Sequence, residues 1–385
     1  MPRAAASCLA GCQAIRSSLA FRWSSSATER PQRHLQTFPG GAGDARTSGD
    51  FVRSQEQEFP MKSAILITLL AASALLSIPA AAQPVEQPAC QRECLEGWVD
   101  RYLAAMRDNA VDPAIFAQGA KFTENGVELR MGGEGLWYGM SGIGNYRFYV
   151  PDIETQQVAF IGTVLEQTSS SATGPTEPEV VAIALRLKIE NDRITEIEQL
   201  AIRPSSTNSS NNDFPPTGEG VEAMGRPNPL FTMPIPEAER ATREELIRDA
   251  NYYFEGLQRN DGQGYYNFTD DCVRFENGVD VLAPRGDRQM QLTCKGQFEN
   301  NLRNVVSRVR DRRFVAVDRE RGIVFAFGYF DHHQINWSWQ LAELFRIENG
   351  DIRRIEAVFH RAPFGMNSGW STFEQGMSEE IQSVR

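Results

Sequence analysis

Apolar residues recur at helical spacing in two separate segments, which begin near Cys90 and at Thr242. Recurrence at every third and fourth position predicts an amphipathic helix in each segment. Thr242 and Glu245 have the spacing of a capping box, so we expect the second helix to begin there and to end near Asn260. The recurring residues are Leu95, Trp98, Val99, Tyr102, Leu103 and Met106 in the first segment, and Leu246, Ala250, Tyr253, Phe254 and Leu257 in the second.

Each helical segment is followed by stretches in which apolar and polar residues alternate. Alternation with a period of two predicts β-strands with one buried face. We expect strands at 121–129, 146–149, 158–167, 179–188 and 193–202 in the first half, and at 272–282, 311–318, 323–331, 339–347 and 352–361 in the second.

The two halves are also related in sequence. The segment Arg346–Arg361, RIENGDIRRIEAVFHR, matches Lys188–Arg203, KIENDRITEIEQLAIR, at a constant offset. In both, an Asn-Gly or Asn-Asp pair supplies turn residues that tolerate positive φ, which predicts a β-hairpin. An Asn-Gly-Val sequence preceded by Glu occurs earlier in each half, at 124–127 and 276–279. The chain therefore contains two copies of one unit, a helix followed by a sheet.

These patterns predict an α+β protein with two similar domains. We expect domain 1 at 88–203 and domain 2 at 240–364. A linker rich in Ser, Asn, Pro and Gly spans 204–239, and a polar tail spans 365–385.

The N-terminal part contains a targeting pattern. Met61 and Lys62 precede an apolar run at 64–78, which is followed by Pro79 and an Ala-x-Ala sequence. This predicts a secretory signal peptide at 61–82 and a secreted or periplasmic protein. Because a signal peptide acts at an N-terminus, we interpret residues 1–60 as a mis-annotated upstream extension. The alternatives are an organelle transit peptide or a signal anchor.

The net charge is −11, and removing residues 1–82 makes the balance more acidic. A strongly acidic protein without a basic stripe is not expected to bind nucleic acid or, after signal cleavage, a membrane. The sequence has no dinucleotide-binding motif, no nucleophile elbow and no metal motif, so no cofactor and no metal are expected.

Four cysteines follow the predicted signal peptide. An even number in an oxidising compartment favours disulfides, and we pair Cys90 with Cys94 and Cys272 with Cys294. The alternative is a zinc site, which the absence of a flanking His disfavours.

Several motifs resemble a known group of proteins. They are the Cys-x3-Cys-Leu opening, the sequences at 122–126 and 135–137, and those at 271–279, 310–313 and 330–332. The chain is similar to the SnoaL-like superfamily, which includes nuclear transport factor 2, ketosteroid isomerase and polyketide cyclase. It more closely resembles a secreted family of tandem SnoaL-like proteins from fungi and bacteria, known as a domain of unknown function. The resemblance implies two cone-shaped domains, each with a curved antiparallel sheet around its helix and an apolar pocket at the open end. It also implies an internal pseudo-dimer or a homodimer.

The positions of the histidines favour a functional site in the second copy. The three that follow the signal peptide are His332, His333 and His360, and all lie near the ends of its later strands. Pocket chemistry in such a fold is proton transfer, so we expect a catalytic group made of His332, Asp331, Tyr253 and His360. Strand alternation places only one of the two adjacent histidines in the pocket, and we favour His332.

Further candidates line the expected pockets. They are Glu276 and Phe330 in the second copy, and Tyr102 and Glu124 in the first. Glu-Asn-Gly also occurs at 348–350, where a hairpin turn is expected, so the two glutamates fit a turn better than a site. The sequence thus leaves two hypotheses. One is a cofactor-free acid–base isomerase, lyase or hydrolase acting on a small apolar or aromatic compound. The other is a non-catalytic small-ligand-binding or scaffolding protein.

Overall fold

The computed structural model describes residues 89–170, 174–204, 215–284, 290–301 and 306–383. These residues belong to one compact unit, Ala82–Arg385. The predicted signal peptide and upstream extension lie outside the described residues. Within the described part, no helix has the length and apolar character needed to cross a membrane.

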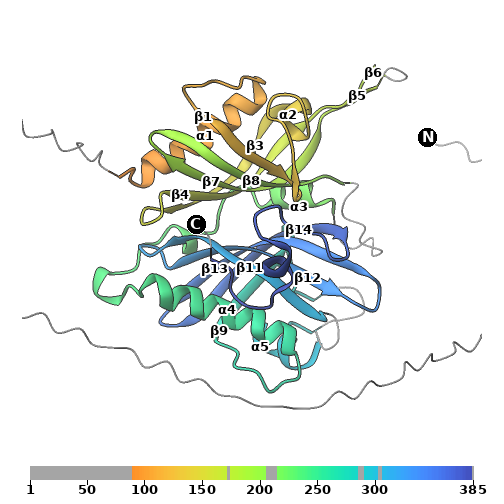
Figure 1. The fold of residues 1–385 in the computed structure, drawn as a ribbon. Helices are drawn as coiled ribbons and strands as arrows, with labels where there is room; N and C mark the ends of the chain where they lie inside the picture. The colour runs from red at the N-terminus through yellow and green to blue at the C-terminus, as the bar shows by residue number, and fades with distance from the viewer. Residues whose placement is uncertain (1–88, 171–173, 205–214, 285–289, 302–305, 384–385) are drawn as a thin grey trace, which may run out of the picture. The chain divides into compact units, whose positions relative to one another are not determined.

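The first copy consists of one long helix, a short helix and a six-stranded sheet (Figure 1). Two further two-residue strands, β5 and β6, form a small separate hairpin. The elements are α1 (Arg92–Arg107), β1 (Phe116–Glu124), β2 (Val127–Glu128), α2 (Leu136–Gly139), β3 (Met140–Asp152), β4 (Gln157–Glu166), β5 (Ser169–Ser170), β6 (Gly174–Pro175), β7 (Glu179–Glu190) and β8 (Arg193–Ile202).

The second copy repeats this order. Its elements are α4 (Arg243–Arg259), β9 (Phe268–Glu276), β10 (Val279–Asp280), α5 (Cys294–Gly296), the π-helical turn η4 (Gln297–Asn301), β11 (Arg308–Asp318), β12 (Ile323–His332), β13 (Trp337–Glu348) and β14 (Asp351–Pro363). The strand orders are β2-β1-β8-β7-β4-β3 and β10-β9-β14-β13-β12-β11. The sheets are therefore equivalent strand for strand, as the sequence repeat predicts.

The local signals in the sequence explain how these elements start and turn. Thr242 and Glu245 form the predicted capping box of α4, and Asn260 ends the helix in the left-handed conformation. Such caps stabilise a helix by about 1 kcal/mol. The paired turn residues also have positive φ, for example Asn349 at 51° and Gly350 at 85°. The hairpin predictions are confirmed.

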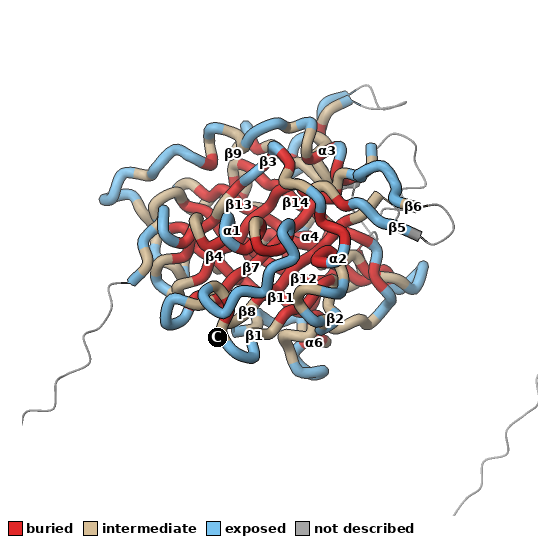
Figure 2. Tube along the Cα trace, turned by 90° about the horizontal axis from the view of Figure 1, so that it is seen from above, coloured by how far each residue is buried: buried red, intermediate tan, exposed pale blue. Residues whose placement is uncertain are grey.

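Each helix packs against one face of its own sheet, and the opposite faces of the two sheets pack against each other (Figure 1). The layer between the sheets is apolar. Phe148 and Ile161 of the first copy and Phe325 and Phe327 of the second are among its buried residues. Figure 2 shows the buried residues concentrated along the strands and the exposed ones in the loops. Burial on both faces gives the sheets a core on each side.

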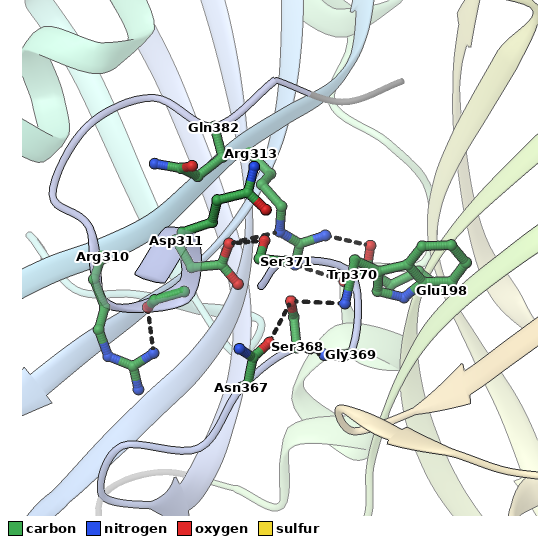
Figure 3. A network of polar contacts seen from close by, with 12 residues as sticks. Glu198, Arg310, Asp311, Arg313, Asn367, Ser368, Gly369, Trp370, Ser371 and Gln382 are labelled. Carbon is green, nitrogen blue, oxygen red and sulfur yellow. Dashed lines mark hydrogen bonds and ion pairs between the residues drawn. The ribbon is translucent and has the colours of Figure 1, made fainter. Parts of the chain in front are cut away.

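Charged side chains also cross between the sheets. The guanidinium of Arg313 on β11 donates two hydrogen bonds, of 2.6 and 2.7 Å, to the carboxylate of Glu198 on β8 (Figure 3). Both residues are buried. Two parallel hydrogen bonds make this ion pair specific in geometry, so it fixes how the two sheets lie on each other.

The segments outside the repeat are more ordered than their composition predicts. The linker contains α3 (Thr217–Ala223), η2 (Pro229–Phe231) and η3 (Glu237–Glu239). The tail contains α6 (Phe373–Met377) and lies along the edge strand β11, where Gln382 N donates to Arg312 O at 2.8 Å. It also reaches the first copy, because Trp370 Nε1 donates to Thr123 Oγ1 at 2.8 Å. The tail thus covers a sheet edge that would otherwise be free to pair.

Both predicted disulfides are present. Cys90 is bonded to Cys94 beside the start of α1, and Cys272 of β9 is bonded to Cys294 of α5. The second bond tethers α5 and η4 to the sheet of the second copy. No cluster of His, Cys, Asp and Glu among the described residues could hold a metal ion.

Candidate functional site

A small cavity lies inside the second copy. Its volume is about 100 Å³. Most of its lining is apolar, and four polar side chains interrupt it: Arg274, Glu276, His332 and Glu343. The apolar lining residues are Leu257, Val306, Phe330, Trp339, Leu341, Ala357 and Phe359. An apolar hollow with a few converging polar groups is the usual form of a small-molecule site.

Glu343 is the most unusual of these groups. It lies on β13 and is 1% exposed, and its Oε2 has no hydrogen-bond partner among the described residues. Burial raises the pKa of its carboxyl to about 8, although the charge of Arg274 and the nearby hydroxyl of Tyr253 act in the opposite direction. A carboxyl with this pKa is protonated at neutral pH and can donate a proton.

Arg274 supplies the positive charge beside this acid. It lies on β9 and forms an ion pair with Glu276 of the same strand, and its Nη1 donates to Gln297 Oε1 at 2.9 Å. Gln297 follows Cys294 in the segment that the disulfide tethers. The tether therefore helps to hold the guanidinium in place at the cavity wall.

The predicted residues Tyr253, His332, Phe330 and Glu276 do lie in this region. His332 and Phe330 share the face of β12 that lines the cavity, as strand alternation predicts. Tyr253 projects from α4 and is buried, which raises the pKa of its phenol well above the ordinary value of 10. Tyr253 and Glu343 are close enough to affect each other's pKa.

Asp331 and His360 do not join this group, so the expected convergence of four catalytic residues is wrong. Asp331 points to the opposite face of β12, where its carboxylate accepts hydrogen bonds from Ser338 at 2.5 Å and from Arg310 at 2.9 Å. Burial alone would raise the pKa of Asp331, but these bonds outweigh it and hold the pKa below its ordinary value. This carboxylate is an ion-pair partner.

The ring of His360 is likewise turned away from the cavity. Its Nε2 lies 3.0 Å from Gln340 Oε1, and its Nδ1 lies 3.1 Å from Arg361 O. Burial lowers the pKa of the imidazole to about 4, so the ring is neutral at neutral pH.

In the first copy, Tyr102 and Glu124 belong to a closed hydrogen-bond network. The Tyr102 hydroxyl donates to Gln199 Oε1 at 2.9 Å, and Gln199 Nε2 donates to Glu124 Oε2 at 3.2 Å. Glu124 also accepts a bond from Leu136 N and pairs with Arg203 at 2.9 Å. These contacts hold the short helix α2 against the sheet and support the turn interpretation of the Glu-Asn-Gly sequence.

One family model matches the chain. It is described as a domain of unknown function (DUF8021), and it matches residues 239–359. That range holds nearly all of the second copy, including every residue that lines the cavity. No curated protein matches the chain.

Three solved structures share local likeness with the chain. A de novo designed protein with a curved β-sheet is 18% identical, with a TM-score of 0.23. The match covers 31% of this chain and 88% of the designed chain. A LEH-like epoxide hydrolase from M. tuberculosis is 16% identical, with a TM-score of 0.23. The match covers 30% of this chain and 83% of the hydrolase chain. An NTF-2 like protein of unknown function from Burkholderia xenovorans is 16% identical, with a TM-score of 0.24. The match covers 34% of this chain and 98% of the Burkholderia chain. At these TM-scores the likenesses carry no argument about activity.

Sequence reasoning from the histidines missed Glu343 and Arg274. Both were visible in the repeat, because the offsets of the matched segments align Glu343 with Leu185 and Arg274 with Phe122. Glu343 is the one charged residue on a strand face that is otherwise apolar, which is the signal that indicates the site. The apolar residues of that face are Trp339, Leu341, Phe345 and Ile347. The first copy keeps hydrocarbon at both positions, and its residues there are buried in the core.

Proposed function

We propose that the second copy binds a small, mostly apolar compound and exchanges protons with it without a cofactor. In this proposal, residues 88–203 and 240–364 form two SnoaL-like (nuclear transport factor 2-like) domains of a secreted or periplasmic protein, and the facing sheets make an internal pseudo-dimer. The two disulfides support the compartment, because such bonds persist in oxidising environments.

The observation that carries the proposal is the position of Glu343. A buried carboxyl with a pKa of about 8 lies in the wall of a mostly apolar cavity. Holding an acid there without an ion pair of its own destabilises the fold, and such groups concentrate at functional sites. General acid catalysis is most effective when the pKa of the acid lies near the working pH.

The lining supplies a donor and an acceptor of protons. With a ketone as substrate, Glu343 gives its proton to the carbonyl oxygen while the carboxylate of Glu276, which lies level with Glu343 across β14, takes a proton from the neighbouring carbon. The C–H bond breaks and an O–H bond forms, so an enol replaces the ketone without net charge. The base then returns its proton to the same or another carbon while the enol gives its O–H proton back to Glu343, which completes exchange or isomerisation and restores both side chains. Arg274 stabilises negative charge that develops near Glu343.

The second candidate is a non-catalytic small-ligand-binding or scaffolding protein. Two observations favour it. The charge of Arg274 is already matched by Glu276, and the apolar layer that both copies share lies between the sheets, away from the cavity. In this case the cavity would hold its ligand without chemistry.

Hydrogen–deuterium exchange separates the two candidates. The purified protein is mixed with cyclohexanone in D₂O near pH 7, and loss of the α-hydrogen signal is followed by NMR. We expect wild type to accelerate exchange and Glu343→Gln to lower the rate by at least about 100-fold, the usual range for loss of a general acid. The exposed Glu128→Gln in the first copy is the matched control. Binding of cyclohexanone without accelerated exchange would instead support the non-catalytic candidate.

A further inference from the structure

Aromatic rings line the approach to the cavity of the second copy. Trp337 and Trp339 follow each other on one face of β13, with ring centroids 4.5 Å apart. The His332 ring lies 4.4 Å from that of Trp337, and the Phe359 ring lies 4.7 Å from that of Trp339. His332, Trp339 and Phe359 line the cavity, while Trp337 and Trp339 keep partial exposure. The rings thus form a continuous aromatic rim, made of His332, Trp337, Trp339 and Phe359, from the surface to the cavity.

The rim is absent from the first copy. The offset of the repeat aligns Trp337 with Glu179, Trp339 with Val181 and Phe359 with Ala201. Three aromatic rings in the second copy therefore stand where the first has a charged residue and two small apolar ones. The strand order does not require aromatic residues here, since both copies share it.

The cavity also restricts size and charge. A volume of about 100 Å³ is smaller than the cavity of about 150 Å³ that accommodates benzene in an engineered protein. A single small ring therefore fills the cavity and extends into the aromatic rim, and a fused second ring has no space inside it. Arg274 and Glu276 cancel each other's charge, and burial keeps Glu343 neutral at neutral pH. A charged ligand would lose its hydration without gaining an ion pair.

We propose that the ligand of the second copy is an uncharged compound of a single small ring with one oxygen function, which the aromatic rim admits and Trp339 limits in size. The ring packs against Trp339 and Phe359, and its oxygen faces Glu343. This inference rests on the proposed function of the cavity and narrows the class of compound that the cavity accepts.

Three probes with related chemistry test it. Phenol, 2-naphthol and benzoate are titrated against the full protein near pH 6.5, and dissociation constants are measured by ligand-observed NMR. We expect phenol to bind at least about tenfold more tightly than 2-naphthol, which has a second ring, and than benzoate, which is charged. Equal or tighter binding of 2-naphthol or benzoate would overturn the inference.

A variant tests the role of Trp339 directly. Trp339→Val introduces the residue that the first copy has at this position and enlarges the cavity. We expect the preference for phenol over 2-naphthol to fall by about tenfold or to reverse. Tyr138→Val, which removes an exposed ring from the first copy, serves as the control and leaves the ratio unchanged. An unchanged ratio in a folded Trp339→Val protein contradicts the size limit.

The outcomes also distinguish this inference from the proposed function. If ring size or charge makes no difference, or if phenol does not bind, the ligand class is wrong. The exchange of cyclohexanone hydrogens, which depends on Glu343, then decides separately whether the acid–base site itself stands.

Discussion

The two copies share every strand of their sheets and differ in what their interiors contain. In the first, Leu185 and Phe122 are buried with Trp137, whose ring lies 5.7 Å from that of Tyr102. In the second, Glu343 and Arg274 occupy the equivalent strand positions, and a cavity lies beside them. The hairpins and the faces between the sheets therefore determine this fold, whereas a few inward positions can change from packed apolar residues to polar ones without altering the strand order.

We expect the largest effect on stability when Leu185 of the first copy is replaced by the glutamate that the second copy has at the equivalent position. Leu185→Glu places a carboxyl without a partner in a packed core, and we expect it to lower the free energy of unfolding by on the order of 5 kcal/mol. Urea denaturation of the variant and wild type at pH 7 measures this difference.

The reciprocal change should behave differently. Glu343→Leu removes a buried acid beside an existing cavity, and we expect a neutral or stabilising effect on unfolding above about pH 8. Equal destabilisation by the two substitutions would contradict the difference between the interiors.

A second effect is a dependence of stability on pH. The folded pKa of Glu343, about 8, lies above its ordinary value of 4.5. The folded state therefore binds a proton that the unfolded state releases, so stability is full below about pH 4.5 and falls as pH rises through 8. We expect Glu343→Gln to remove a loss on the order of 4 kcal/mol between about pH 5 and pH 9. Denaturation of both proteins across this range measures it, and parallel curves would argue against a buried acid.

Much of the fold could be predicted because its signals are local. The Asn-Gly turns, the capping box of α4 and the alternation along the strands are each set by neighbouring residues. The site was harder to predict, because its contacts join distant segments. Asp331 pairs with Arg310 across β11 and β12, which no spacing in the sequence indicates. Glu343 could not be assigned from the sequence, because the cavity beside it is formed by residues from distant segments, such as Leu257 and Phe359.

The third prediction concerns the packed interior of the first copy. Trp137 is 1% exposed and fills the space beneath α2. We expect Trp137→Ala to lower the free energy of unfolding by about 3 kcal/mol or more, because it leaves a cavity beside the buried rings of Tyr102 and Phe116. Thermal and urea unfolding measure the change. A loss below about 1 kcal/mol would mean that the first copy is not tightly packed there.

The smallest expected effect is acid sensitivity from His360, which the repeat aligns with Ile202. Burial lowers the folded pKa of His360 to about 4 from 6.5. The unfolded state therefore gains a proton first, and stability falls as pH drops below about 6.5. We expect a loss of about 2 kcal/mol between about pH 7 and pH 5 that His360→Gln removes. Unfolding measured at these two pH values tests it, and an equal loss in the variant would assign the sensitivity to other groups.

The most direct test of the account is a spectroscopic titration of the Glu343 carboxyl. Infrared spectra of wild type minus Glu343→Gln isolate the C=O stretch of this one group as pH is raised. We predict a protonated carboxyl band that persists at pH 7 and disappears with a midpoint near pH 8. A carboxyl that is already ionised at about pH 6 would contradict the account, because the second copy would then hold an ordinary carboxylate and no acid for the proposed chemistry.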